Sequence, residues 1–379
     1  MNILFLADPS SIHDLKWITY QADEHQLFLV RRASHVSLQE DYKHQILEVG
    51  FLHDFSIIRI FKTISGFLKL RSIIKTHKID VFHVYFVEPN ILWAIFKPFL
   101  GVKIIATTRG TDILVTIKNH FRQFSLANLY TRILYQIAFR NCDCITGTSK
   151  GQKQMIRELF GLSDQVHVIR TGVDVSAMEK ISSGSSLISG TRKYVFMPRV
   201  MKPLYNHEFT VEAIGLLKKE ILADYDFVFI DEDAQDQSYV NRIKTLMEDN
   251  GAANFIFLTR QNQEQLFKLY YGTSLVIMNP ISDGTPVSGL EAMYFGKPLI
   301  LGPLGYDRDV FGEWTYILGE WSVQELAHTI EQAFLGFSEE ESIQAREVVI
   351  NLGNRSSEMK KISSLYEAVT ASVEKSAST

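Results

Sequence analysis

The sequence predicts an α/β protein with two parallel sheets, because short β-branched or aromatic runs alternate with longer amphipathic segments along the whole chain. A length of 379 residues suits two domains of ordinary size, and 46% hydrophobic with 22% charged residues is typical of a globular chain. Strand–helix alternation of this kind covers both faces of each sheet with helices. We therefore expect two Rossmann-like domains that face each other, with one substrate bound beyond the strand ends of each.

The expected strands divide evenly between the two halves of the chain. In the first half they are 3–7, 27–31, 81–85, 103–107, 143–147 and 166–169, and in the second half 194–197, 227–230, 255–258, 275–278, 298–301 and 315–317. Helical periodicity falls between them, for example over 152–160, 208–219, 239–250 and 263–271.

The domain boundary is expected in the segment 181–190, which is rich in Ser and Gly and has no periodicity. The sequence thus predicts a first domain over 1–180 and a second over 191–345. A C-terminal helix over 346–379 should pack back towards the first domain.

No run of 18 apolar residues occurs, since the longest candidate, 91–106, is broken by Lys97, Pro98 and Lys103. The chain begins directly with a strand and shows no signal-peptide pattern. We expect a cytoplasmic protein with reduced thiols.

Two pairs of residues carry predictions about strands. Cys142 and Cys144 should project to one face of a strand without bonding to each other. His83 and Tyr85, on a strongly apolar strand, should lie in the core.

Charge is distributed unevenly, with a net charge of +6 over 1–180 and −10 over 181–379. The segment 59–75 is basic and amphipathic. It is interpreted in two ways: a helix resting on anionic lipid at the inner face of a membrane, or a helix covering the first sheet with its charged side in water.

An acidic loop leads into a helix over 279–293. Asp283, Gly284 and Thr285 should form a turn and cap, with Pro286 in the first helical turn.

The backbone N–H groups of Val287 and Ser288 would then favour a phosphate at the helix end. Glu291 lies about one turn further on and Asp283 lies in front, within reach of a sugar hydroxyl. The alternative is an ordinary capped helix with a solvated Glu.

With Glu291-Ala292-Met293 followed by Gly296-Lys297-Pro298, this segment resembles the retaining GT-B glycosyltransferases of family 4, which use nucleotide-sugar donors. Asp283 stands where the family has the first Glu of Glu-x7-Glu. The resemblance extends over nearly the whole chain, through Ser11-Ile12-His13-Asp14, Arg109-Gly110-Thr111-Asp112, Ser149-Lys150 and 166–174.

The resemblance implies a donor site in the second domain and an acceptor site in the first. The family places an Arg and, five residues on, a Lys against the diphosphate. Arg199 fits the Arg, whereas Leu204 occupies the Lys position and Lys202 lies nearby. Both cations would stabilise the leaving phosphate.

The other expected donor contacts come from three parts of the chain. Asp283 would orient the sugar, Glu291 would accept from the ribose hydroxyls, and the loop of Thr259 and Arg260 would read the base. Gly284, Thr285, Val287, Ser288 and Arg109 complete the expected binding set. His13 is either a catalytic or acceptor contact, or a histidine that merely caps a helix.

The implied reaction moves a sugar from a nucleotide diphosphate, with UDP favoured, to a saccharide or lipid-linked acceptor. Bacterial cell-surface polysaccharide, lipopolysaccharide or glycolipid synthesis is the expected setting. No cofactor, metal or nucleic acid is expected, and Asp231-Glu232-Asp233 is interpreted as a solvated turn. The alternatives are a non-catalytic GT-B subunit of a transferase complex and a nucleotide-sugar epimerase.

Overall fold

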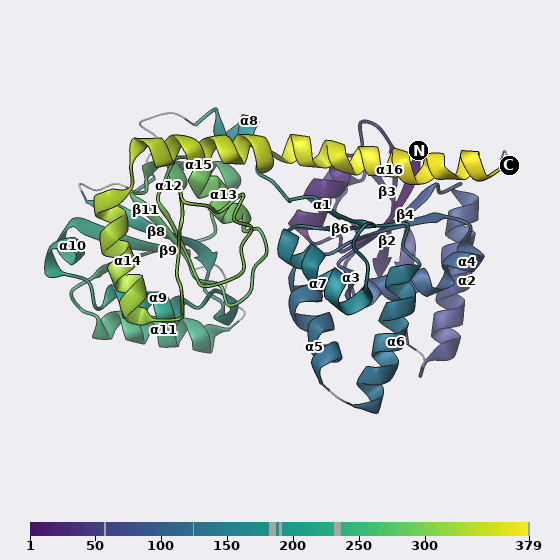
Figure 1. Ribbon diagram of the computed structural model, residues 1–379, viewed down its shortest axis with the longest axis horizontal. Helices are drawn as coiled ribbons and strands as arrows, with labels where there is room; N and C mark the ends of the chain where they lie inside the picture. The colour runs from purple at the N-terminus through teal and green to yellow at the C-terminus, as the bar shows by residue number, and fades with distance from the viewer. Residues whose placement is uncertain (57, 124, 182–186, 189–191, 231–235, 378–379) are drawn as a thin grey trace. The chain divides into compact units, whose positions relative to one another are not determined.

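The computed structural model describes residues 1–377 except 57, 124, 182–186, 189–191 and 231–235, and it does not describe the side chains of residues 12, 13 and 372–377. The chain divides into two compact units (Figure 1). Unit 1 comprises 1–171 and 356–379, and unit 2 comprises 172–355. The predicted linker 181–190 and the acidic run at 231–233 fall largely or wholly outside the described residues.

Unit 1 is built on a seven-stranded sheet in which every described strand pair is parallel. The strands, in spatial order, are β3 (Ile46–Leu52), β2 (Gln26–Arg32), β1 (Asn2–Leu6), β4 (Val81–Tyr85), β5 (Lys103–Thr107), β6 (Cys144–Gly147) and β7 (Val166–Val168).

Helices cover both faces of this sheet. They are α1 (Ile12–Thr19), η1 (Glu40–Tyr42), α2 (Ile60–Thr76), α3 (Val87–Asn90), η2 (Ile91–Phe96), α4 (Lys97–Leu100), η3 (Asp112–Ile117), α5 (Lys118–Arg122), α6 (Leu126–Arg140), α7 (Lys150–Phe160) and, from Ser356 onward, α16 (Arg355–Ala377).

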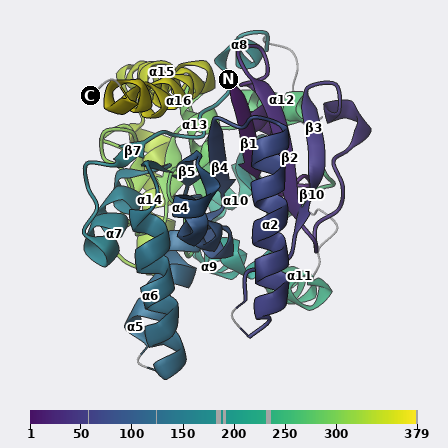
Figure 2. The ribbon, with the colours of Figure 1, turned by 90° about the vertical axis from the view of Figure 1, so that its right-hand side faces the viewer.

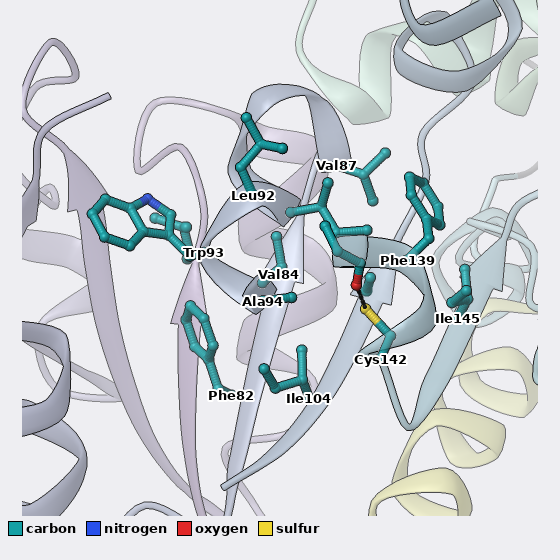
Figure 3. Close-up of a cluster of buried hydrophobic side chains, with 14 of the residues drawn as sticks. Phe82, Val84, Val87, Leu92, Trp93, Ala94, Ile104, Phe139, Cys142 and Ile145 are labelled. Carbon is teal, nitrogen blue, oxygen red and sulfur yellow. Dashed lines mark hydrogen bonds between the residues drawn. The ribbon is translucent and has the colours of Figure 1, made fainter. Parts of the chain in front are cut away.

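Alternation along the strands separates two apolar cores. Leu4 and Leu6 of β1 enter the core shared with α2 and α6, whereas Ile3 and Phe5 enter the core shared with α1 and α16. Figure 2 shows α2 lying along the sheet, and Figure 3 shows strand residues such as Phe82 and Ile104 in the same core as Phe139 and Cys142.

Unit 2 repeats the architecture on a six-stranded sheet, again parallel in every described pair. Its spatial order is β10 (Asn254–Leu258), β9 (Tyr225–Ile230), β8 (Lys193–Val200), β11 (Leu275–Met278), β12 (Leu299–Leu301) and β13 (Tyr316–Ile317). The predicted parallel α/β class is confirmed.

The helices of unit 2 alternate with these strands. They are α8 (Val175–Met178), η4 (Pro203–Tyr205), α9 (His207–Ile214), α10 (Lys219–Asp224), α11 (Gln237–Asp249), α12 (Gln263–Gly272), α13 (Val287–Tyr294), α14 (Val323–Gly336) and α15 (Glu339–Leu352). The helix predicted over 208–219 is shorter than expected, because α9 ends at Ile214 before Gly215 and α10 begins only at Lys219.

The last helix, α16, is anchored in unit 1. Met359, Ile362 and Tyr366 lie in the same core as the β1 residue Phe5, and Gln21 Nε2 donates to the Met359 carbonyl. The Tyr366 hydroxyl is 2.7 Å from Nδ1 of His83, whose Nε2 lies 2.7 Å from Thr107 Oγ1. The expected burial of His83 and Tyr85 is confirmed, since both are fully buried.

The expectation that Cys142 and Cys144 share one strand face is wrong. Strand β6 begins at Cys144, so Cys142 lies in the turn after α6 and does not follow the strand alternation. Cys142 packs in the core with α6, where its thiol donates to the Ala138 carbonyl (Figure 3), and Cys144 packs in the opposite core. Both thiols are free.

Candidate active site

An ion pair lies beyond the strand ends of unit 2, between Arg199 and Asp283. Arg199 is near the end of β8, and Asp283 follows β11, the strand that pairs with β8. Since parallel strands end at the same edge, the two side chains meet, with Arg199 Nη2 donating to Asp283 Oδ2 at 3.0 Å. Burial alone would lower the pKa of Arg199, but the Asp283 carboxylate raises it above its ordinary value.

Two aromatic hydroxyl residues surround this pair. The Arg199 guanidinium lies over the Tyr205 ring at 5.0 Å. Tyr306 is buried, and burial raises the pKa of its hydroxyl far above the ordinary value. The charges of Asp283 and Arg199 also act on this hydroxyl, so Tyr306 lies near the pair. Within the described residues, the Tyr306 hydroxyl and Arg199 Nε have no hydrogen-bond partner. A guanidinium with an unused buried donor is suited to bind an anion.

Helix α13 begins at Val287 and presents its N-terminus beside the acidic loop. Pro286 is itself the N-cap and no side chain caps the helix, so the expected cap by Asp283 to Thr285 is wrong. Instead Asp283 Oδ1 accepts from the Gly284 amide at 2.7 Å, which forms a tight turn. The first N–H groups of α13, at Val287 and Ser288, have no acceptor within the helix and carry the positive end of its dipole.

Glu291 is buried in unit 2, which excludes the solvated carboxylate of the alternative interpretation. It accepts from Gln263 Nε2 at 3.0 Å and forms a side-chain hydrogen bond with Tyr270. Tyr270 also bonds to Ser288, and burial with the nearby carboxylate raises the pKa of its hydroxyl well above the ordinary value. A carboxylate held from two sides keeps a fixed direction.

The other expected donor contacts have different environments. Gly284 and Thr285 are buried in the acidic loop. Lys202 is exposed and directly precedes the short helix η4, while Thr259 and Arg260 are exposed after β10.

Four residues of this site were not predicted from the sequence: Tyr205, Gln263, Tyr270 and Tyr306. Gln263 carries one usable signal, because it starts a helix directly after a strand end.

Arg109 and His13 belong to unit 1. Arg109 Nη2 donates to Asp14 at 3.0 Å, and its guanidinium lies 4.4 Å from the Trp17 ring and 5.1 Å from the Tyr85 ring. Burial raises the pKa of Asp14 despite this cation. His13 is the second residue of α1, and its side chain lies outside the described residues.

The loop that carries Arg109 is fixed by Asp112. This buried carboxylate accepts from the backbone N–H groups of Val87, Arg109, Gly110 and Ile113. Burial raises the pKa of Asp112, against the opposing effect of these four donors. Asp112 therefore positions the loop.

In the described part of the chain, no helix has the length and apolar character needed to span a bilayer. No group of three or more His, Cys, Asp or Glu side chains there is arranged to hold a metal ion.

Two family models match consecutive parts of the chain. Glycosyltransferase Family 4 matches residues 18–177, and Glycosyl transferases group 1 matches residues 178–347. No curated protein matches the sequence significantly.

Solved structures with the same fold cover nearly the whole chain. A glycosyltransferase from Rickettsia africae superposes with a TM-score of 0.80 at 16% identity, covering 97% of this chain and 98% of that chain. Anabaena Alr3699/HepE in complex with UDP gives 0.76 at 16% identity, covering 97% and 100%. Sucrose-phosphate synthase from Thermosynechococcus elongatus gives 0.73 at 14% identity, covering 98% and 100%.

Two parallel sheets in consecutive halves of the chain, together with these matches, define a nucleotide-sugar glycosyltransferase of the GT-B class. The chain belongs to glycosyltransferase family 4, a family of retaining transferases, as its Glu291-Ala292-Met293 segment predicted.

Proposed function

We propose that this enzyme transfers a glycosyl group from a UDP-sugar to a hydroxyl of a saccharide or lipid-linked acceptor in bacterial cell-surface polysaccharide, lipopolysaccharide or glycolipid synthesis. Unit 2 binds the donor and unit 1 the acceptor. The observation that carries the donor assignment is the partly buried Arg199 guanidinium, beyond the same strand edge as the N-terminus of α13. Anabaena Alr3699/HepE, which shares the fold, has been solved with UDP and with UDP-glucose.

Leaving-group stabilisation is the main catalytic contribution in this proposal. Negative charge builds on the β-phosphate as the glycosidic bond breaks. Arg199 and the amides of Val287 and Ser288 meet that charge, with Lys202 as a second cation. Loss of one such donor is expected to raise the barrier by about 3–4 kcal/mol, by analogy with oxyanion-hole deletions.

The two carboxylates have separate roles. Glu291, which Gln263 and Tyr270 hold in place, accepts from the ribose hydroxyls. Asp283 orients the donor sugar once the diphosphate has taken over Arg199. The exposed loop of Thr259 and Arg260 contacts the base.

The acceptor assignment is supported by buried polar groups in unit 1. Trp17 Nε1 and the Tyr85 hydroxyl are buried beside Arg109 and have no hydrogen-bond partner within the described residues. Donors of this kind are costly to bury unless a ligand or water satisfies them. They suit the hydroxyls of a saccharide, and His13 at the start of α1 is a further candidate contact.

Titration calorimetry with UDP, GDP and ADP tests the donor assignment. We expect heat with UDP, and absence of heat with all three nucleotides would refute the proposal. Two other functions predict different results. A non-catalytic subunit would co-purify with a partner and hydrolyse no donor, and an epimerase would convert the donor sugar without an acceptor.

A further inference from the structure

Helix α6 of unit 1 presents an apolar outer face. Its exposed positions Leu126, Leu129, Tyr130, Ile133 and Ile137 recur at helical spacing, so they form one stripe along the helix. Leu126 is 87% exposed. The opposite face carries Tyr135, Ala138 and Phe139, which are buried. A helix that is apolar on both its inner and outer faces is typical of one that contacts a second apolar phase.

The start of α2 shows the same feature. Ile58 and Phe61 are 98% and 86% exposed, and Ile60, Ile64 and Leu68 are exposed as well. The inner face of α2 packs on the sheet through Leu70, Ile73 and Ile74. The helix therefore covers the sheet, as one of the two interpretations of 59–75 requires, and it also keeps an apolar outer face at its N-terminal end.

Both helices begin beyond the same edge of the unit 1 sheet. Helix α2 follows β3 in the chain, and the helices η3, α5 and α6 follow β5. Both strands run parallel to their neighbours in the sheet. Segments that follow parallel strands start at the carboxyl edge of the sheet. Figures 1 and 2 agree, since the start of α2 and the α5–α6 pair extend in the same direction from the sheet.

Charge completes the pattern. Residues 55–79 contain six Lys and Arg and no Asp or Glu, and residues 113–142 contain four Lys and Arg and no Asp or Glu. Of the latter, Arg122 and Arg140 are exposed on α5 and α6. Exposed apolar side chains flanked by cations alone complement an anionic lipid surface, in which the apolar groups enter the acyl boundary and the cations meet the headgroups.

We propose that the exposed residues of α2 and α6, hereafter the docking surface, seat unit 1 on an anionic membrane. The docking surface consists of Ile58, Ile60, Phe61, Ile64, Leu68, Leu126, Leu129, Tyr130, Ile133, Ile137, Arg122 and Arg140. Both helices begin at the carboxyl edge of the unit 1 sheet, so their exposed first turns would bring that edge close to the membrane. This surface is independent of the donor site, and an acceptor embedded in the same bilayer would be presented to that edge.

The test is flotation of the full-length protein with phosphatidylcholine vesicles that either contain or lack phosphatidylglycerol. We expect binding to the anionic vesicles at low salt and loss of binding at high salt. Arg122→Gln and Arg140→Gln should each weaken binding about fivefold, the equivalent of one cation near the surface.

Substitution of the apolar stripe is the decisive variant. Leu126→Glu with Ile133→Glu should abolish flotation, and both side chains are exposed enough for the fold to tolerate the change. Leu335→Glu is the matched control, because Leu335 of α14 is 89% exposed and belongs to unit 2. Circular dichroism should show all three chains folded.

Three results would overturn the proposal. They are no binding of the wild type to anionic vesicles, undiminished binding of the Leu126/Ile133 variant, and a wild-type dimer in sedimentation velocity that the variant loses, which would make a second copy the occupant. UDP calorimetry on the same variants separates this proposal from the donor assignment. The docking variants should bind UDP like the wild type, and lipid binding should persist even if UDP produces no heat.

Discussion

Arg199 and Asp283, 84 positions apart in the sequence, form a partly buried ion pair at 3.0 Å. Arg199 was expected to contact the diphosphate of the donor, and Asp283 was expected to contact its sugar. The two charges neutralise each other, so a diphosphate bound as proposed would compete with Asp283 for the guanidinium. The Asp283 carboxylate also raises the pKa of Arg199 and so keeps its guanidinium charged.

Asp283→Asn should tighten UDP binding while transfer is lost. The substitution frees Arg199 from a charge-assisted hydrogen bond, which corresponds to about tenfold in the dissociation constant. The same change removes the group proposed to orient the sugar. Calorimetry with UDP and a transfer assay check the two parts. Asp54→Asn, which breaks the exposed pair with Arg32 in unit 1, is the control and should change neither.

Glu291→Gln should weaken UDP binding by about 10- to 100-fold, the contribution of a hydrogen bond to a charged group, and leave pyrophosphate binding unchanged. Only the nucleotide carries a ribose, so the difference isolates that contact. Glu264→Gln, one residue beyond Gln263 and exposed with Lys268 as its partner, should leave both ligands unaffected. Equal weakening of UDP and pyrophosphate would place Glu291 at the phosphates instead.

Tyr306→Phe should reduce UDP affinity about fivefold, the value of one hydrogen bond of about 1 kcal/mol, without reducing stability. The hydroxyl has no partner within the described residues, so its removal sacrifices no contact seen in the fold. Calorimetry and thermal unfolding measure the two quantities. A large fall in the unfolding temperature with unchanged UDP affinity would show that the hydroxyl serves the fold.

Acid should destabilise unit 1 through His83. Burial lowers the pKa of His83 to about 3, whereas the unfolded chain binds the proton near the ordinary value of 6.5. Stability is therefore full above pH 6.5 and falls as the pH drops towards 3, by up to about 1.4 kcal/mol per pH unit for this residue.

Urea unfolding at about pH 7 and about pH 5 measures this slope. His83→Gln should be less stable than the wild type at pH 7 and should show a flatter dependence on pH. His44→Gln, at an exposed position, should retain the wild-type slope. An unchanged slope in His83→Gln would assign the acid sensitivity to other groups.

Gly66→Ala should destabilise the protein by about 1–3 kcal/mol, the usual cost of overpacking. A Cβ at Gly66 would overlap the Trp93 ring, which packs against the middle of α2. Gly305→Ala is the control, since a Cβ there meets no atom within 4 Å. Denaturant unfolding compares the two, and equal stability would show that Trp93 moves aside freely.

Most strands were predictable because each one is a contiguous run of mainly apolar residues. Val81–Tyr85, Lys103–Thr107 and Leu275–Met278 have the predicted bounds. Strand β3 was missed because it is an edge strand with Glu48 in its centre and Gly50 at φ +141, beside a register shift that hides its alternation. Glu48 is tolerated there through its ion pair with Arg31, a contact that no local pattern reveals.

The candidate site was predictable where a motif is contiguous. Glu291 follows from the segment after β11, but its partners Gln263 and Tyr270 come from another helix. The pairing of Asp283 with Arg199 likewise depends on β8 and β11 being neighbours in the sheet, although η4, α9, α10, β9, α11, β10 and α12 lie between them in sequence. Spatial order within a sheet is set by tertiary packing, which the strand pattern alone does not specify.

The anchoring of α16 has a consequence for synthesis of the protein. The core beneath Phe5 contains Met359, Ile362 and Tyr366, so one face of the unit 1 sheet lacks part of its cover until the final helix is available. On the ribosome, all of unit 2 emerges before that helix does. The half of the chain that is made first should therefore be the last to complete its core, and chains that stall within unit 2 should expose that apolar sheet face to chaperones and proteases.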